Sequence, residues 1–339
     1  MVNFRFHIVS LTAVLLALGI GLVLGTTFLD EATIDGLESQ LDGLERDLDA
    51  AEEQNRRQQE RLDMFERERE QLAEQLGDRL YDGLLEGDPV LVVATRGVDE
   101  RWVDEVLRML GQADAQVVGV WWLTDRLVLD DDDEVGDLAA ALELSTDDAD
   151  RLRRNLAVQL ADVLYGASEA PDAVAPPPAD VPGQTAPAEP PLLARLRDAG
   201  FVEYELPEGA EGDVVRLPVS GLRVVVVDGP GASVSVGEVV LPVLEELTSD
   251  GPMPVVATQP SVRTGEDVDA TEEPQLVQAI RGDDELADRI TTVDNLDHTA
   301  GRVATLLATV DAVPGSPTVG RYGTGEGVDG LLPTPADEG

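Results

Sequence analysis

The sequence contains no cysteine and no lysine, and its only histidines are His7 and His298. Without cysteine the chain forms no disulfide, no thiolate metal site and no cysteine nucleophile. Without lysine it has no P-loop lysine, no kinase-type lysine and no Schiff base. Because His7 borders a long apolar segment, the two histidines are not expected to share a metal ion. These absences exclude the enzyme classes that depend on those side chains.

The charge is strongly one-sided. The chain has 68 acidic residues against 24 basic residues, all of them arginine, for a net charge of -44. A polyanion would be repelled by such a surface, so nucleic acid is disfavoured as a partner. Two explanations of the acidity stay open. It is either an adaptation to high external salt, which screens self-repulsion, or the composition of an acidic, GC-rich genome.

Proline is absent from the first 88 residues, and residues 8–29 carry no charge. As a helix these 22 residues would span ~33 Å, close to the ~30 Å hydrocarbon core of a bilayer. We therefore predict a transmembrane anchor in residues 1–29. The alternative is a cleaved signal peptide, whose apolar region is shorter, roughly 7–15 residues. Arg5 precedes the span and Asp30 follows it, so the positive-inside rule predicts a single-pass cell membrane protein with a cytoplasmic N-terminus and an extracytoplasmic bulk.

Small residues recur every four positions within this span, at Ala13, Ala17, Gly21 and Gly25. This spacing puts them on one helix face, where they favour close packing against another helix in the membrane. The alternative is that glycine and alanine are simply common in such spans.

A heptad pattern predicts that residues 30–80 form a coiled coil. Ten of the 13 a and d positions over 43 residues are apolar, which is typical of a helix that needs a partner. A polar Asn55 at an a position favours a fixed register and two strands. Acidic flanking positions leave open whether the partner is a second copy, in a parallel homodimer, or a different and more basic helix. The predicted interface residues are Ile34, Leu37, Leu41, Leu44, Leu48, Asn55, Leu62, Phe65, Leu72 and Leu76.

Apolar runs alternate with amphipathic segments over residues 88–335, which predicts an extracytoplasmic α/β domain with a Rossmann-like, mostly parallel sheet. Residues 168–191 hold eight prolines and are predicted to be a linker or surface loop inserted into this domain. Strands are expected at 89–95, 117–123, 222–228, 254–258 and 292–293. Helices are expected at 100–111, 147–164 with a cap at Ser145 or Thr146, 192–199, 238–247 and 298–308.

Motifs that suggest chemistry each have a simpler explanation. The acidic run at 130–134 lacks the glycine of a calcium loop, so a solvated loop leading into a helix near 138–142 is favoured. The G-x-G-x-x-G pattern at 325–330 follows no strong strand, which disfavours dinucleotide binding. The Asp-Gly-Pro-Gly segment at 228–231 predicts a tight turn rather than a ligand site.

Two further candidates are also given structural roles. Trp121 and Trp122 should point to opposite faces of one strand, both in the core. His298 is interpreted as a helix-start residue. No catalytic, cofactor-binding or metal-binding residue is assigned, and a carboxylate-based hydrolase is kept as an alternative.

Three segments carry a family resemblance: HIVSLTAVLLALGIGLVLGT at 7–26, TVDNLDHTAGRVATLLA at 292–308 and GRYGTGEGVDGLLP at 320–333. Together with the heptads they resemble the mycobacterial-type copper transport protein family, the MctB-like proteins. The resemblance implies an actinobacterial envelope protein that keeps intracellular copper low, described in mycobacteria as channel-like in the outer membrane. Related corynebacterial proteins are implicated in cell separation together with a partner membrane protein.

The residues themselves favour an indirect copper role. Copper(I) prefers thiolate and thioether ligands, and the chain has no cysteine and only the scattered Met1, Met64, Met109 and Met253. A membrane barrel would need many alternating strands, and the patterns predict β-α alternation instead. We therefore expect a non-enzymatic envelope protein that serves copper homeostasis or export through a partner. The alternative is a coiled-coil scaffold or regulator of cell separation or cell-wall processes.

Overall fold

The computed structural model describes residues 6–25, 53–54, 56–59, 64, 81–168, 189–206, 221–249, 253–261 and 275–334. The chain divides into two compact units, Met1–Gln71 and Leu72–Gly339. In the first unit Phe6–Gly25 is an exposed helix, and it is the one helix among the described residues that is long and apolar enough to cross a membrane. All ten predicted coiled-coil residues lie outside the described ranges: Ile34, Leu37, Leu41, Leu44, Leu48, Asn55, Leu62, Phe65, Leu72 and Leu76.

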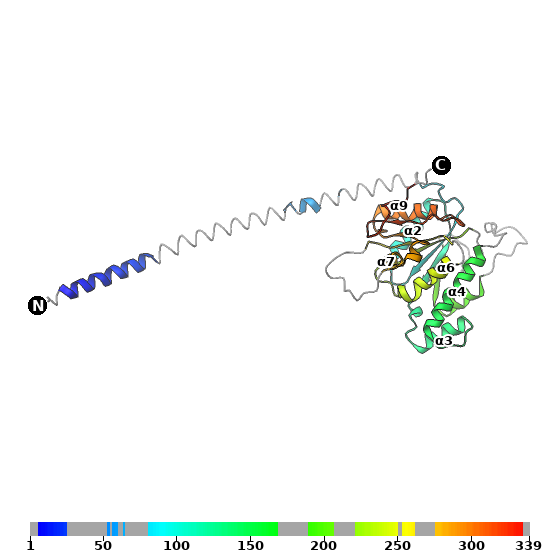
Figure 1. Cartoon of the computed structure of the whole chain (residues 1–339), viewed down its shortest axis with the longest axis horizontal. Coiled ribbons are helices and arrows are strands. Elements are labelled where there is room, and N and C mark those ends of the chain that lie inside the picture. The colour runs from blue at the N-terminus through cyan, green and yellow to red at the C-terminus, as the bar shows by residue number, and fades with distance from the viewer. Residues whose placement is uncertain are drawn as a thin grey trace, which may run out of the picture. The chain divides into compact units, whose positions relative to one another are not determined.

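A seven-stranded sheet forms the centre of the second unit, with the strand order β3-β2-β1-β4-β5-β6-β7 (Figure 1). The strands are β1 (Pro89–Thr95), β2 (Gln116–Leu123), β3 (Val202–Glu205), β4 (Arg223–Val227), β5 (Val255–Thr258), β6 (Thr291–Val293) and β7 (Arg321–Tyr322). Neighbouring strands pair in parallel, except that β3 runs antiparallel to β2. The prediction of a mixed α/β fold with a mostly parallel sheet is confirmed, whereas β3 and β7 are strands that the sequence patterns do not predict.

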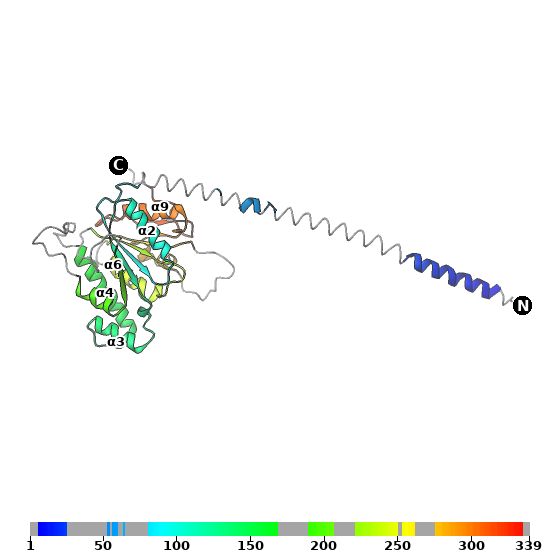
Figure 2. The same cartoon turned by 180° about the vertical axis from the view of Figure 1, so that it is seen from behind.

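Helices cover both faces of this sheet. On one face α2 (Glu100–Gln112) and α9 (Thr299–Asp311) bury their apolar sides in a single core cluster. The other cluster is built from helices α3 (Asp132–Ala141), α4 (Ala149–Ser168), α5 (Pro191–Asp198), α6 (Leu241–Ser249), α7 (Leu276–Arg281) and α8 (Asp284–Ala287). Figure 2 shows the same two layers from behind, with α2 beside α9 and α4 beside α6. Two-sided cover explains why the strands are continuous apolar runs.

The two neighbouring tryptophans confirm that both sheet faces are buried. Trp121 and Trp122 are each only 2% exposed, and they belong to opposite core clusters. The Trp122 indole nitrogen donates to Glu205 at 3.0 Å, and the Arg96 guanidinium stacks 4.2 Å from the ring centroid. Both tryptophans are core residues, as the alternation of strand side chains predicts.

Two helix starts differ from the predictions. The acidic run is not a loop: Asp131 caps α3 by accepting the Glu134 amide at 2.8 Å, and the next three acidic residues form the first turn of that helix. Carboxylates are favourable there because the helix N-terminus carries partial positive charge. The predicted cap at Ser145 or Thr146 is wrong as well, because Asp148 accepts the Arg151 amide at 3.0 Å at the start of α4.

Candidate functional site

The carboxyl ends of β1 and β4 are the place where an α/β sheet most often binds a ligand. The strand order reverses between these two neighbours, and ligands of open α/β sheets commonly lie in the crevice at such a point. Thr95 ends β1 and Asp228 directly follows β4, so the register of the two strands brings their side chains together. The Thr95 hydroxyl donates to the Asp228 carboxylate at 2.6 Å, and both residues are about 1% exposed.

The loops above this pair close the crevice with backbone. A Cβ atom added at Gly97 would overlap the carbonyl oxygen of Gly231, and one added at Gly231 would lie 2.7 Å from the oxygen of Gly97. Both glycines have φ of +91°. The Ser233 amide donates to the Arg96 carbonyl at 2.7 Å, which joins the loops further. Among the described residues, the main chain of these two loops therefore meets directly above the ends of β1 and β4.

The tight turn predicted at 228–231 forms one residue later in this loop, at 229–232. The Ala232 amide donates to the Gly229 carbonyl at 3.2 Å, which closes a four-residue turn. The sequence pattern indicates the turn, but it gives no sign of the contact with Gly97 far along the chain. The signal that could have identified Asp228 as a site residue is its place immediately after a buried parallel strand.

His298 lies beside a serine and an aspartate without forming a nucleophilic pair. It occupies the N-cap position of α9, which confirms its interpretation as a helix-start residue. Its Nε2 is 3.6 Å from Asp297, whereas the Ser261 hydroxyl and amide both donate to Asp297, at 2.8 and 2.7 Å. The histidine side chain is 57% exposed. Because the serine is bound to the carboxylate rather than to the imidazole, His298 is not placed to activate it.

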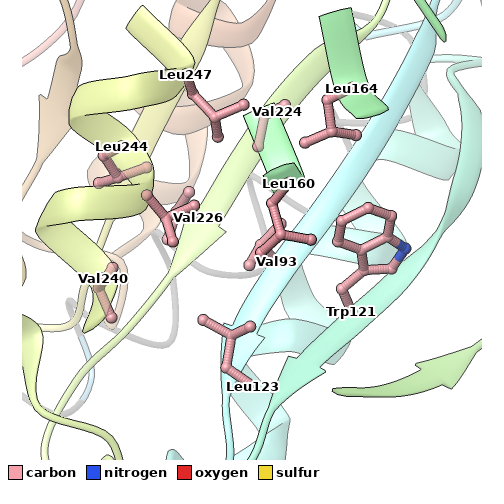
Figure 3. A pocket seen from close by; sticks show the side chains of 11 residues that line it. Val93, Trp121, Leu123, Leu160, Leu164, Val224, Val226, Val240, Leu244 and Leu247 are labelled. Atoms are coloured by element: carbon pink, nitrogen blue, oxygen red, sulfur yellow. The ribbon is translucent and has the colours of Figure 1, made fainter. Parts of the chain in front are cut away.

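An apolar cavity lies between α4, α6 and the sheet. Figure 3 shows leucine and valine side chains from these elements pointing into one space, with the Trp121 ring as a wall and its nitrogen directed away. The cavity encloses about 20 Å³, roughly the room of one water molecule, and apolar voids of this kind stay dry. Its lining residues are Val93, Trp121, Leu123, Leu160, Leu164, Val224, Val226, Val240, Val243, Leu244 and Leu247.

Two aromatic groups beside the cavity have polar atoms without partners in the described part of the chain. They are the Trp121 indole nitrogen and the Tyr204 hydroxyl, both buried. The two rings are cross-strand neighbours with centroids 5.8 Å apart. Burial raises the pKa of the Tyr204 phenol above its ordinary value, and the Glu189 carboxylate adds to the rise. The phenol is therefore neutral at physiological pH.

The described residues offer no cluster of three or more His, Cys, Asp or Glu side chains that could hold a metal ion. Met109 and Met253 are 3% and 4% exposed, and they belong to core clusters on opposite faces of the sheet. The sheet separates these two thioethers, so they cannot bind one copper ion together.

The predicted packing residues of the N-terminal span all lie in the helix Phe6–Gly25. Ala13, Ala17, Gly21 and Gly25 are exposed, and a Cβ added at either glycine would meet nothing within 4 Å. An α-helix turns by about 100° per residue, so the four positions share one side. Whether a second helix packs there stays a prediction.

Known proteins are similar to this chain over almost its entire length. The sequence model of the family described as copper transport outer membrane protein, MctB, matches residues 1–333. Copper transporter MctB of Mycobacterium tuberculosis is 28% identical over 336 residues, which cover 96% of this chain and 98% of the relative. Copper transporter MctB of Mycobacterium leprae is 28% identical over 340 residues, covering 98% and 99% of the two chains.

Proposed function

Because the chain belongs to the MctB family of copper transport outer membrane proteins, we propose that it serves copper homeostasis or export at the cell envelope. The observation that carries this proposal is the extent of the family match, which includes both the apolar N-terminal helix and the α/β unit. Relatives named copper transporters align over the same extent. The helix Phe6–Gly25 is the proposed single-pass anchor, with the N-terminus in the cytoplasm and the Rossmann-like domain outside.

The copper role is proposed to be indirect. Thiolate ligands are absent from the sequence, and Met109 and Met253 are buried on opposite sides of the sheet. Copper(I) binding at a soft site in this domain would therefore require the core to open. A partner that binds the metal, held in place by this protein, fits these residues better.

Proposed contacts with such a partner are the small-residue face of the anchor and the heptads of residues 30–80. Two apolar seams in one continuous segment favour a paired helix, either with a second copy or with a more basic protein. A scaffold or regulator of cell separation is the second candidate function, and the heptads are what favour it. The filled crevice between β1 and β4 supports a non-enzymatic role for either function.

The test is a strain of the source organism without this gene. We expect lower copper tolerance and higher cellular copper content, both restored by the full-length chain. Gly21→Ile with Gly25→Ile should fail to restore them, whereas Leu16→Ile with Val23→Ile, on the other side of the helix, should succeed. Unchanged copper tolerance and content in the deletion strain would overturn the copper proposal, and chains of unseparated cells in that strain would favour the scaffold function.

A competition titration with a Cu(I) chelator tests the indirect role separately. The full-length protein in detergent should take up far less than one equivalent of copper. Stoichiometric uptake would contradict the indirect role while leaving the copper function standing.

A further inference from the structure

The C-terminal glycine-rich segment, residues 320–330, is joined to the sheet by a very short strand. Its β7 is only two residues long and pairs with β6 at two positions. The Tyr322–Gly330 bridge and two bonds between Arg321 and Asp329 fold the segment back on itself. Residues 324–327 are exposed to solvent. Backbone pairing alone thus holds little of this segment to the domain.

The carboxylate of Asp294, at the end of β6, supplies the main attachment. It is 4% exposed and accepts the Thr324 amide at 2.8 Å and the Gly325 amide at 2.9 Å. Arg281 of α7 forms an ion pair with the same carboxylate at 2.5 Å. Arg281 also donates to the Tyr322 carbonyl at 2.9 Å. One buried ion pair therefore binds the segment from two sides.

Two glycines make this attachment possible. A Cβ added at Gly323 would overlap the Asp294 carboxylate, and one added at Gly325 would lie 2.5 Å from it. Gly323 also has φ of +127°, a conformation that other residues rarely adopt. Gly325 is the first glycine of the G-x-G-x-x-G pattern at 325–330, whereas Gly323 lies outside that pattern. Of the glycines in the pattern, Gly325 alone would meet the Asp294 carboxylate with an added Cβ. The amides that face Asp294 are those of Thr324 and Gly325, just before the pattern and at its start.

An attachment of this kind separates from the domain more readily than a packed element does. Residues 324–327 are exposed, and Tyr322 is the side chain of this segment that packs against a core cluster. Segments with few buried apolar contacts open at lower free energy than the core. A buried ion pair adds specificity of position more than net stability, because desolvation offsets much of the attraction. We propose that residues 320–330 are a latch that opens and closes as a unit over the end of β6 while the remaining domain stays folded. Asp294 is the residue that holds this latch closed.

Opening has a defined consequence for the sheet. The amides of Thr292 and Asp294 donate to the carbonyls of Gly320 and Tyr322, at 3.0 and 3.3 Å. When the latch opens, these amides lose their partners and β6 becomes an edge strand. The latch therefore determines whether β6 is paired with β7 or is itself the edge strand of the sheet.

Hydrogen exchange of the full-length protein in detergent micelles tests the latch. Amides of residues 321–326 should exchange at least about tenfold faster than those of β4, with rates that low denaturant hardly changes. Asp294→Asn should speed exchange of the latch amides by a further tenfold or more, and low denaturant should still hardly change their rates. Trypsin, which cuts this lysine-free chain only at arginine, should then cleave that variant after Arg321.

Asp297→Asn is the matched control, because that carboxylate accepts hydrogen bonds from Ser261 and not from the latch. It should leave the exchange of residues 321–326 as it is in the natural protein. The proposal is overturned if the latch amides exchange only together with β4. Exchange of the latch amides in Asp294→Asn that rises with denaturant as steeply as that of β4 would overturn it too, because these amides would then open only with the whole fold.

Discussion

Replacing Gly97 by alanine tests whether the crevice between β1 and β4 is firmly closed. The new Cβ would overlap the Gly231 carbonyl, and the residue would be held at φ of +91°. Left-handed backbone costs about 1–2 kcal/mol for alanine. If the loops separate to relieve the overlap, the bonds from Ser233 to Arg96 and from Thr95 to Asp228 are lost as well. We expect the free energy of unfolding to fall by about 3–5 kcal/mol in total.

The assay is urea unfolding of the full-length protein in detergent, followed by tryptophan fluorescence. All three tryptophans, Trp102, Trp121 and Trp122, lie in the α/β unit, so the signal reports on that unit. Gly136→Ala is the control, because Gly136 lies within α3 with open space around it. That change should stabilise by roughly 0.5–1 kcal/mol. A loss below about 1 kcal/mol for Gly97→Ala would refute the closed crevice, since freely separating loops would absorb the overlap.

Three further measurements test the core and the charge. Val226→Ile, beside the cavity, should be neutral or stabilise by up to about 0.8 kcal/mol. Val227→Ile adds the same methylene to a fully buried residue of the other core cluster and should cost roughly 1–3 kcal/mol. Equal effects of the two substitutions in urea unfolding would count against the cavity. Tyr204→Phe should stabilise slightly at pH 7, because it removes a buried hydroxyl without a partner in the described residues. Since burial raises the folded pKa of Tyr204, the natural protein should lose stability as pH rises past about 10, and the variant should lose less. Raising NaCl from about 0.1 to 1 M shortens the electrostatic screening length from about 10 to 3 Å. Because the net charge is -44, weaker repulsion between acidic side chains should raise Tm. A lower Tm would contradict the idea that this repulsion destabilises the fold.

The central strands could be predicted because each one is a continuous run of apolar residues in the sequence. The predicted strand 89–95 coincides with β1, a continuous apolar run that starts at Pro89. Such runs are typical of parallel strands that are buried on both faces. The strand predicted at 254–258 agrees with β5 to within one residue for the same reason.

The edge strands could not be predicted, because distant residues hold them. In β3 two glutamates alternate with Val202 and Tyr204, a weak pattern on its own. This strand forms because Glu205 receives the Trp122 indole and Glu203 pairs with Arg96. β7 depends on Asp294 and Arg281, which lie tens of residues earlier in the chain. Local periodicity contains none of these contacts.

The same limit applies to the site. The turn at 229–232 follows from its glycines and proline, but its contact with Gly97 depends on how β1 and β4 align. Similarly, Gly325 could be recognised as part of the pattern at 325–330, but Gly323 lies outside that pattern, and the carboxylate of Asp294 is what requires a glycine at both positions. The small-residue face and the heptads are local patterns, so they could be predicted, and they await a test in the membrane.

The buried carboxylates of the α/β domain serve its structure rather than binding a metal or catalysing a reaction. A metal ligand or a catalytic acid must be able to exchange its partner for a metal ion or a substrate. Asp228 is engaged by Thr95, and Asp294 by Arg281 and two amides, so either exchange would break contacts that hold loops in place. Breaking a buried ion pair by removing one partner typically costs about 3–5 kcal/mol. A copper function for this protein is therefore better sought in the assembly proposed for its anchor and heptads than in the side chains of its α/β domain.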